Sequence, residues 1–153
     1  MFVMKNADKI YMDVCSLCRP FDDQHYLRIR LETNAVNLIL SKVKDSHLEL
    51  INSPVLIKEI ESIDDDLERT ELLQLLNKYG KIYNFKADIL KNRIETLISL
   101  RFGIADAAHI AFAEYYNAIF ITCDDKLLNK CKKYINIIPS YNPVIFCEKE
   151  KLK

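Results

Sequence analysis

Short apolar runs alternate with longer stretches of helical periodicity along this chain. The strand-like runs are residues 10–13, 47–52, 81–85, 118–122 and 144–147. Between them, apolar residues recur at steps of three and four, which predicts helices over residues 25–43, 54–60, 64–76, 87–98, 104–117 and 126–134. Strands that alternate with helices in this way predict an α/β domain.

Local signals mark several helix ends. Ser53 followed by Pro54 is a favourable helix start, because serine caps the first turn and proline suits the first helical position. The acidic run 64–66 opens the next helix, where negative charge is favourable. Gly103 is expected to end a helix from the left-handed conformation.

The carboxyl-terminal end of the chain is predicted to be an edge strand and a tail. Pro143 precedes the apolar run 144–147, which we expect to be the last strand of the sheet. Residues 148–153 are mostly charged and are expected to fray. A single domain is therefore predicted over residues 1–147.

Two of the strand-like runs end in an acidic residue. Asp13 closes the first run, and Asp124 follows the run 118–122 just before a predicted helix. In an open parallel sheet, ligands bind outside the carboxyl ends of the strands, where the strand order reverses. We therefore expect these two acids to meet.

Two helical acids join them as candidates. Asp106 lies in an alanine-rich segment that can approach the sheet closely, with His109 three residues further on the same face. Glu59 follows the apolar stripe of its helix, whereas Glu61 leans away from that stripe. A gathering of carboxylates of this kind is typical of a site for a divalent metal.

Each acid also has a purely structural explanation. Asp106 could complement the dipole at the start of its helix, and Asp124 could cap the helix that follows it. Glu59 could be a solvated surface glutamate, as Glu61 could. Asp13 is the hardest to explain in this way, because a charge that ends an apolar strand needs a partner.

Composition limits the classes that this chain can belong to. Its 153 residues, 50% of them hydrophobic, suffice for one domain with a substantial core. The 22 basic residues balance 22 acidic ones, so no strong overall field attracts nucleic acid. No apolar run approaches the roughly 20 residues that span a bilayer, and the first residues show no signal-peptide core. We expect a soluble cytoplasmic protein with no membrane partner.

The five cysteines favour reduced thiols over a disulfide framework, because their number is odd and no export signal accompanies them. Cys15 and Cys18 have the spacing of a zinc knuckle or a redox pair, but no second such pair exists. Cys15 and Cys123 flank the two strand-end acids, and we expect them to line the same pocket. The chain contains no phosphate-binding loop, dinucleotide turn or serine elbow.

Four segments together resemble the PIN domain family in order and spacing, over nearly the whole chain. They are residues 10–24, residues 53–59, the Asp-Ala-Ala-His segment within 104–111, and the Thr-Cys-Asp segment within 121–124. The resemblance implies a three-layer α/β/α fold around a mainly parallel sheet of about five strands. It also implies a metal-dependent ribonuclease, among whose small single-domain members are the VapC toxins of bacterial toxin–antitoxin pairs.

Carried over residue by residue, the resemblance implies that Asp13, Glu59, Asp106 and Asp124 form the acidic quartet of the active site. Ser16 and Thr122 are polar neighbours expected to contact the substrate. Arg19, Lys126 and Lys130 are basic residues that could hold flanking phosphates.

An all-oxygen ligand set suits Mg²⁺ or Mn²⁺. The predicted function is hydrolysis of RNA phosphodiester bonds, with single-stranded RNA as the expected substrate. The narrower alternative is a toxin with a cognate antitoxin, and a different alternative is a catalytically inert interaction module. A homodimer through Tyr115 and Tyr116, or through residues 67–76, is also open. A phosphate-transfer receiver domain is disfavoured, because no lysine follows a strand in the required place.

Overall fold

The computed structural model describes residues 8–153, so most of the segment in which no signal-peptide core was found lies outside the described residues. Five strands form one parallel sheet in the order β3-β2-β1-β4-β5. The strands are β1 (Asp8–Met12), β2 (Leu48–Ile51), β3 (Gly80–Lys81), β4 (Ile119–Ile121) and β5 (Ser140–Tyr141). In register, Ile10 of β1 lies between Leu50 of β2 and Ile119 of β4.

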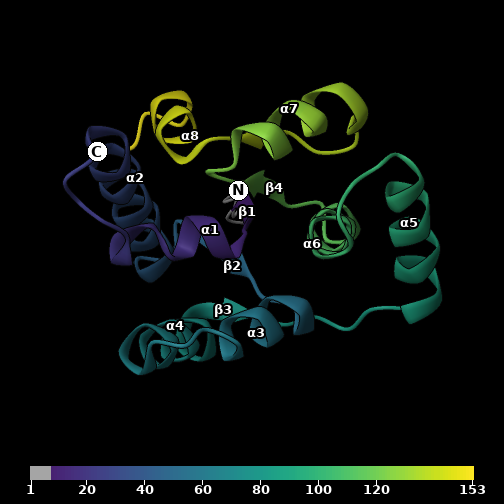
Figure 1. Ribbon diagram of the computed structural model, residues 1–153, viewed down its shortest axis with the longest axis horizontal. Helices are drawn as coiled ribbons and strands as arrows, with labels where there is room; N and C mark the ends of the chain where they lie inside the picture. The colour runs from purple at the N-terminus through teal and green to yellow at the C-terminus, as the bar shows by residue number, and fades with distance from the viewer. Residues whose placement is uncertain (1–7) are drawn as a thin grey trace, which may run out of the picture.

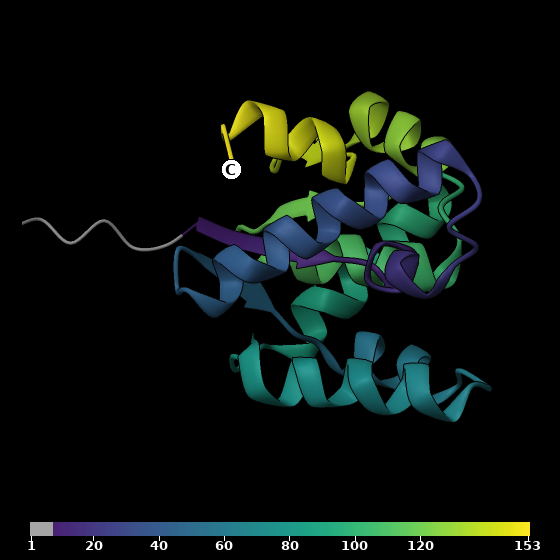
Figure 2. The same ribbon diagram turned by 90° about the vertical axis from the view of Figure 1, so that its left-hand side faces the viewer.

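Helices cover both faces of this sheet. They are α1 (Val14–Leu17), the 3-10 turn η1 (Arg19–Phe21), α2 (Leu27–Lys44), α3 (Pro54–Glu61), α4 (Asp66–Tyr79), α5 (Ala87–Ser99), α6 (Ile104–Tyr115), α7 (Asp125–Tyr134) and α8 (Pro143–Lys149). Figure 1 shows α2 and α8 on one side of the central strands and α5 and α6 on the other. Seen from the side in Figure 2, α2 lies across the front of β1, with α4 below it. The expected three-layer α/β/α fold is confirmed.

The alternation of side chains along β1 divides the core into two parts. Tyr11 points to the face covered by α5, α6 and α7, where it packs with Phe120 and the apolar side of α6. Ile10 and Met12 point to the opposite face, where they pack with residues of α2, α3 and α4 such as Ile39. Both faces of every central strand are therefore buried, as a parallel sheet requires.

The predicted edge strand over residues 144–147 is wrong, because these residues belong to the helix α8. Asn142 caps this helix by accepting a hydrogen bond from the Val144 amide, and Pro143 occupies its first turn. Phe146 is fully buried among the residues that α2 packs against the sheet. The domain boundary expected at residue 147 falls inside α8, and Leu152 of the expected tail packs against the same core.

The expected role of Gly103 is also wrong. The left-handed residue after α5 is Arg101, whose φ is 70°. Gly103 has a φ of −61° and precedes the first turn of α6 instead. The predicted strand over residues 81–85 is shortened to Gly80–Lys81.

The other expected helix starts agree with the structure. Ser53 caps α3 by accepting from the Leu56 amide, with Pro54 in the first turn. Asp65 caps α4 by accepting from the Glu68 amide. Within residues 8–153, no helix has both the length and the apolar character needed to cross a bilayer.

Candidate active site

The candidate site lies where the strand order reverses, between β1 and β4. From β1 the chain continues to β2 and β3 on one side, while β4 and β5 lie on the other. Asp13 directly follows β1, and its amide donates to the carbonyl of Ile121, the last residue of β4, at 3.3 Å. The two strand-end acids therefore flank one crevice, as the position of a switch point predicts.

A cavity of about 380 Å³ opens at this point. Its walls come from the ends of β1 and β4 and from α1, α3 and α6. The lining residues are Asp13, Val14, Cys15, Cys18, Asp22, Glu59, Asp106, His109 and Asp124. The structure thus brings all four expected acids to one cavity, although they lie up to 111 positions apart in the sequence.

Asp13 is the most buried of the four acids, with an exposed fraction of 5%. It caps α1, and its Oδ1 accepts from the Ser16 amide at 3.1 Å. Its Oδ2 accepts from the Thr122 hydroxyl at 2.6 Å. Burial raises the pKa of Asp13, and these hydrogen bonds oppose the rise because they stabilise the ionised form.

Ser16 and Thr122 have a different role from the expected contact with substrate. Both are fully buried. The Ser16 hydroxyl donates to the Ile121 carbonyl at 3.2 Å. Thr122 donates to Asp13 and also accepts from the Asp124 amide at 3.1 Å. Because neither side chain is exposed, both support the ends of β1 and β4, and neither lines the cavity.

Asp124 does cap the helix that follows it. Its Oδ1 accepts from the amides of Lys126 and Leu127 at 3.0 and 3.1 Å, and its side chain is exposed at the mouth of the cavity. The structural explanation for this acid is therefore correct. It does not compete with a role in metal binding, because the cap engages one carboxylate oxygen only.

Asp106 lies in the first turn of α6 and is half-buried. Burial raises its pKa, and the charges of Asp13, Asp124 and Glu59 raise it further, whereas His109 opposes the rise. The carboxylates are thus close enough to repel one another. A cation in the cavity would relieve this repulsion.

Glu59 reaches the cavity from α3, and its Oε1 lies 2.9 Å from Nε2 of His109. Glu61, two residues later, is exposed and does not line the cavity. The choice of Glu59 from the position of the apolar stripe therefore agrees with the structure. His109 is buried and was noted in the sequence only for its spacing from Asp106.

The basic residues expected to hold phosphates differ in availability. Arg19 donates to Glu32 at 2.9 Å and to Asp22 at 3.0 Å. Lys130 donates to the Arg101 carbonyl at 2.6 Å. Both are therefore engaged within the protein. Lys126 is exposed in the first turn of α7, beside Asp124.

The donor atoms of the cavity fit a hard divalent cation in chemistry, because carboxylate oxygens are the ligands that Mg²⁺ and Mn²⁺ prefer. Their present orientation is not that of a closed metal site. Within residues 8–153, no three His, Cys, Asp or Glu side chains surround a common point. Several carboxylate oxygens instead accept hydrogen bonds from protein groups, so side-chain rotation would accompany binding.

The cysteines near the cavity are free thiols. Cys15 and Cys18 line the cavity, whereas Cys123 is buried beside it. A hydrogen bond with Cys123, together with burial and the charge of Asp13, raises the pKa of Cys15. Burial raises the pKa of Cys18 to about 12. Within residues 8–153, no further His, Cys, Asp or Glu side chains join Cys15 and Cys18 in a group that could hold zinc, so the zinc alternative is further disfavoured.

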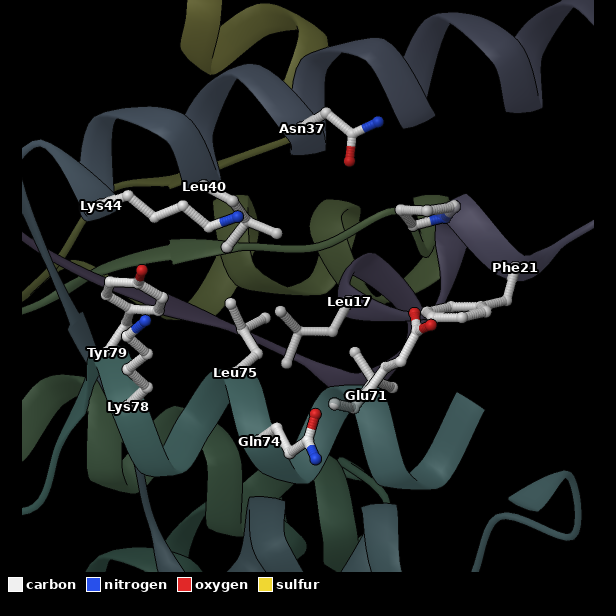
Figure 3. Close-up of a pocket in the computed structure, with 12 residues that line it drawn as sticks. Leu17, Phe21, Asn37, Leu40, Lys44, Glu71, Gln74, Leu75, Lys78 and Tyr79 are labelled. Carbon is white, nitrogen blue, oxygen red and sulfur yellow. The ribbon is translucent and has the colours of Figure 1, made fainter. Parts of the chain in front are cut away.

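A second hollow, of about 340 Å³, lies between α2 and α4. Figure 3 shows Leu17 and Leu75 in its centre, Lys44, Lys78 and Tyr79 at one end, and Glu71 with Phe21 at the other. Glu71 is the one acid in its lining, so this hollow has no carboxylate cluster. The cavity at the strand ends is therefore the better candidate for binding a metal ion.

Fold and site together define a class: a three-layer α/β/α domain with acidic side chains gathered at the switch point of a parallel sheet. A family model described as the PIN domain matches residues 25–133, which is more than half of the chain. The chain therefore belongs to the PIN domain family. Its fold is also similar to that in the crystal structure of FitAcB from Neisseria gonorrhoeae, at 14% sequence identity and a TM-score of 0.54, covering 88% of this chain and 97% of that one. No curated protein matches the chain in sequence.

Proposed function

We propose that this protein is a divalent-metal-dependent endoribonuclease. The single observation that supports this proposal best is the gathering of Asp13, Glu59, Asp106 and Asp124 in one open cavity, with the pKa of Asp106 raised by burial and by the charges of the other three. Perturbed carboxylates that share a cleft are typical of functional sites. Membership of the PIN domain family supports the same chemistry.

Each acid has a part in holding Mg²⁺ or Mn²⁺. Asp106 and Asp124 would present free oxygens directly to the cation, because Asp106 makes no side-chain hydrogen bond in the described part of the chain and the cap of Asp124 uses only Oδ1. Asp13 would contribute from the floor of the cavity, held in place by Thr122. Glu59 would ligate or orient water through the oxygen that His109 does not engage.

A bound divalent cation lowers the pKa of a water and steadies the charge on a leaving phosphate oxygen. The protein itself supplies the carboxylates from the ends of β1 and β4, from α3 and from the first turn of α6. Lys126 at the mouth of the cavity is placed to contact a phosphate beside the scissile bond. Single-stranded RNA is the expected substrate, because a flexible strand can bend one phosphodiester into a cavity of about 380 Å³.

The test is cleavage of a fluorescent single-stranded RNA with Mn²⁺ or Mg²⁺, compared with the same reaction in EDTA. Asp106→Asn should fold normally and lose cleavage. The matched control is Asp88→Asn, which changes an exposed acid in the first turn of α5. Loss of activity in EDTA and in Asp106→Asn, but not in Asp88→Asn, supports the proposal. Equal activity in both variants refutes it.

The second candidate is a catalytically inert interaction module. It is favoured by one observation, namely that no three candidate ligands within residues 8–153 already surround a common point. Calorimetric titration with Mn²⁺ separates the two candidates. Binding that disappears in Asp106→Asn favours the nuclease, whereas no binding by the wild-type protein favours the inert module.

A narrower version of the proposal makes the protein the toxin of a type II pair with a cognate antitoxin. Co-expression with the product of a small adjacent reading frame, followed by purification of a complex that suppresses cleavage, would support it. A homodimer also stays a prediction. Tyr116, named for that interface, is buried and donates its hydroxyl to the Tyr83 carbonyl, so it belongs to the core of the protomer.

A further inference from the structure

A continuous hydrogen-bonded chain leads from the core to the candidate site. The Leu56 amide donates to the Ser53 hydroxyl at 3.1 Å, and that hydroxyl lies 2.7 Å from the hydroxyl of Tyr11. The Tyr11 hydroxyl lies 2.6 Å from Nδ1 of His109, whose Nε2 lies 2.9 Å from Oε1 of Glu59. The chain joins β1, α3 and α6, and it connects residues 98 positions apart.

The hydrogen-bonded chain is shielded from water except at its last member, Glu59. Tyr11 and Ser53 are fully buried, and His109 is 2% exposed. The side chain of Glu59 is 32% exposed at the cavity. The Tyr11 and His109 rings also pack on each other, with centroids 5.5 Å apart. Tyr11, Ser53 and His109 are therefore held by packing as well as by hydrogen bonds, and Glu59 is the member that reaches the cavity.

For a neutral His109, the hydrogen bonds have one consistent direction. Nε2 of His109 faces a carboxylate oxygen, so it must carry a hydrogen. In the neutral imidazole, Nδ1 is then an acceptor, which the Tyr11 hydroxyl satisfies by donating. Tyr11 in turn accepts from Ser53, which accepts from the Leu56 amide. Every polar side-chain atom of this hydrogen-bonded chain then has a partner. This agrees with residues 8–153 as a whole, where no buried side-chain nitrogen or oxygen lacks a hydrogen bond.

The state of Tyr11 supports this direction. Burial raises its pKa, and the charges of Glu59 and Asp13 act in the same sense. The hydroxyl therefore stays protonated and remains able to donate to His109. A phenylalanine at this position would pack equally well but would leave Nδ1 without a donor.

We propose that His109, held by Tyr11 as the Nε2–H tautomer, is a positioning residue that aims Glu59 into the cavity. This inference rests on the proposed nuclease function, because it assigns Glu59 the task of binding a metal ion or its water. The hydrogen bond to His109 engages Oε1 and leaves Oε2 to face the cavity. Partners that orient a metal ligand in this way commonly contribute about 10- to 100-fold to metal affinity or activity.

The first test compares His109→Leu with His109→Gln, because glutamine can supply an amide donor near the position of Nε2. We expect His109→Leu to weaken Mn²⁺ binding and to lower kcat by about 10- to 100-fold, with little change in KM for RNA. His109→Gln should restore most of both. A wild-type Mn²⁺ affinity in folded His109→Leu would overturn the proposal.

The second test keeps the histidine and removes its donor. Tyr11→Phe should lower the population of the Nε2–H tautomer, measured by nitrogen-15 NMR of the imidazole, and should weaken Mn²⁺ binding in the same direction. Tyr116→Phe is the matched control, because it removes a buried tyrosine hydroxyl bonded to a backbone carbonyl away from the site. A wild-type protein with the Nδ1–H tautomer would refute the proposed direction.

These tests separate this inference from the proposed function. If the wild-type protein cleaves RNA and His109→Leu behaves identically, the nuclease proposal stands and the positioning role fails. If the wild-type protein neither binds Mn²⁺ nor cleaves RNA, the nuclease proposal fails. The crystal structure of His109→Leu then decides the positioning role: Glu59 turned away from the cavity supports it, and an unchanged Glu59 side chain overturns it.

Discussion

Replacing Thr122 with valine removes the hydroxyl that joins the two strand-end acids. This hydroxyl donates to Oδ2 of Asp13 at 2.6 Å and accepts from the Asp124 amide at 3.1 Å. Valine preserves the shape but leaves a buried carboxylate oxygen without this donor. A hydrogen bond to a charged group contributes about 1.5 to 3 kcal/mol. For a chain of this length, that loss corresponds to a fall in Tm of roughly 3 to 12 °C.

The pH dependence of this loss follows from the pKa of Asp13. Burial raises that pKa in the folded protein above its unfolded value, so ionisation of Asp13 opposes folding, and stability rises as pH falls through the folded pKa. Removing the Thr122 donor raises the pKa further. The difference in stability between Thr122→Val and the wild type should therefore be largest above the folded pKa of Asp13 and should shrink as pH falls below it, where Asp13 is neutral in both proteins.

The assay is urea unfolding in EDTA at a series of pH values, so that no metal contributes. Thr122→Ser is the control, because it keeps the hydroxyl and loses only a buried methyl group, at about 1 kcal/mol at every pH. A loss for Thr122→Val that is independent of pH, or that equals the loss for Thr122→Ser throughout, would refute the role given to this hydroxyl.

Two further predictions concern Glu32 and Cys15. Glu32 is 2% exposed and pairs with Arg19, so Glu32→Ala should cost about 3 to 5 kcal/mol in urea unfolding. Asp125→Ala, which breaks an exposed arginine pair, should cost much less. Similar costs for the two variants would contradict this assignment. The thiol of Cys15 should react slowly with iodoacetamide at pH 7, although part of the residue is exposed, because the hydrogen bond with Cys123, the low hydration of the sulfur and the charge of Asp13 raise its pKa. Mass spectrometry of the alkylated protein measures this rate, and labelling as fast as that of a free thiol would contradict it.

The sequence predicts the meeting of the strand-end acids because the relevant signals are local. Asp13 and Asp124 each follow an apolar run, and parallel strands place their carboxyl ends at one edge of the sheet. The cap at Ser53 and the helix start at the acidic run 64–66 are local in the same sense, and both agree with the structure. Such features need no knowledge of the distant packing.

The failures have physical reasons as well. Residues 144–147 are a short apolar run, and periodicity alone does not distinguish a buried strand from a short buried helix. The signal that distinguishes them is Asn142 followed by Pro143, a cap and first-turn pair of the kind correctly used at Ser53. The burial of Ser16 was not predictable, because it depends on its contact with the Ile121 carbonyl, 105 positions away.

The structural and functional explanations of Asp124 and Asp106 are compatible because each structural role leaves part of the carboxylate available. Asp124 caps α7 through Oδ1 alone, and Asp106 lies in the first turn of α6, where its charge is favoured by the helix amides. Backbone amides at these helix starts thus offset part of the negative charge, which lets the carboxylates share one cavity. The carboxylates nevertheless still repel one another. Burial and the charges of the other acids together raise the pKa of Asp106, although the helix amides favour its charge. The cavity therefore retains unbalanced negative charge, which favours binding a divalent cation.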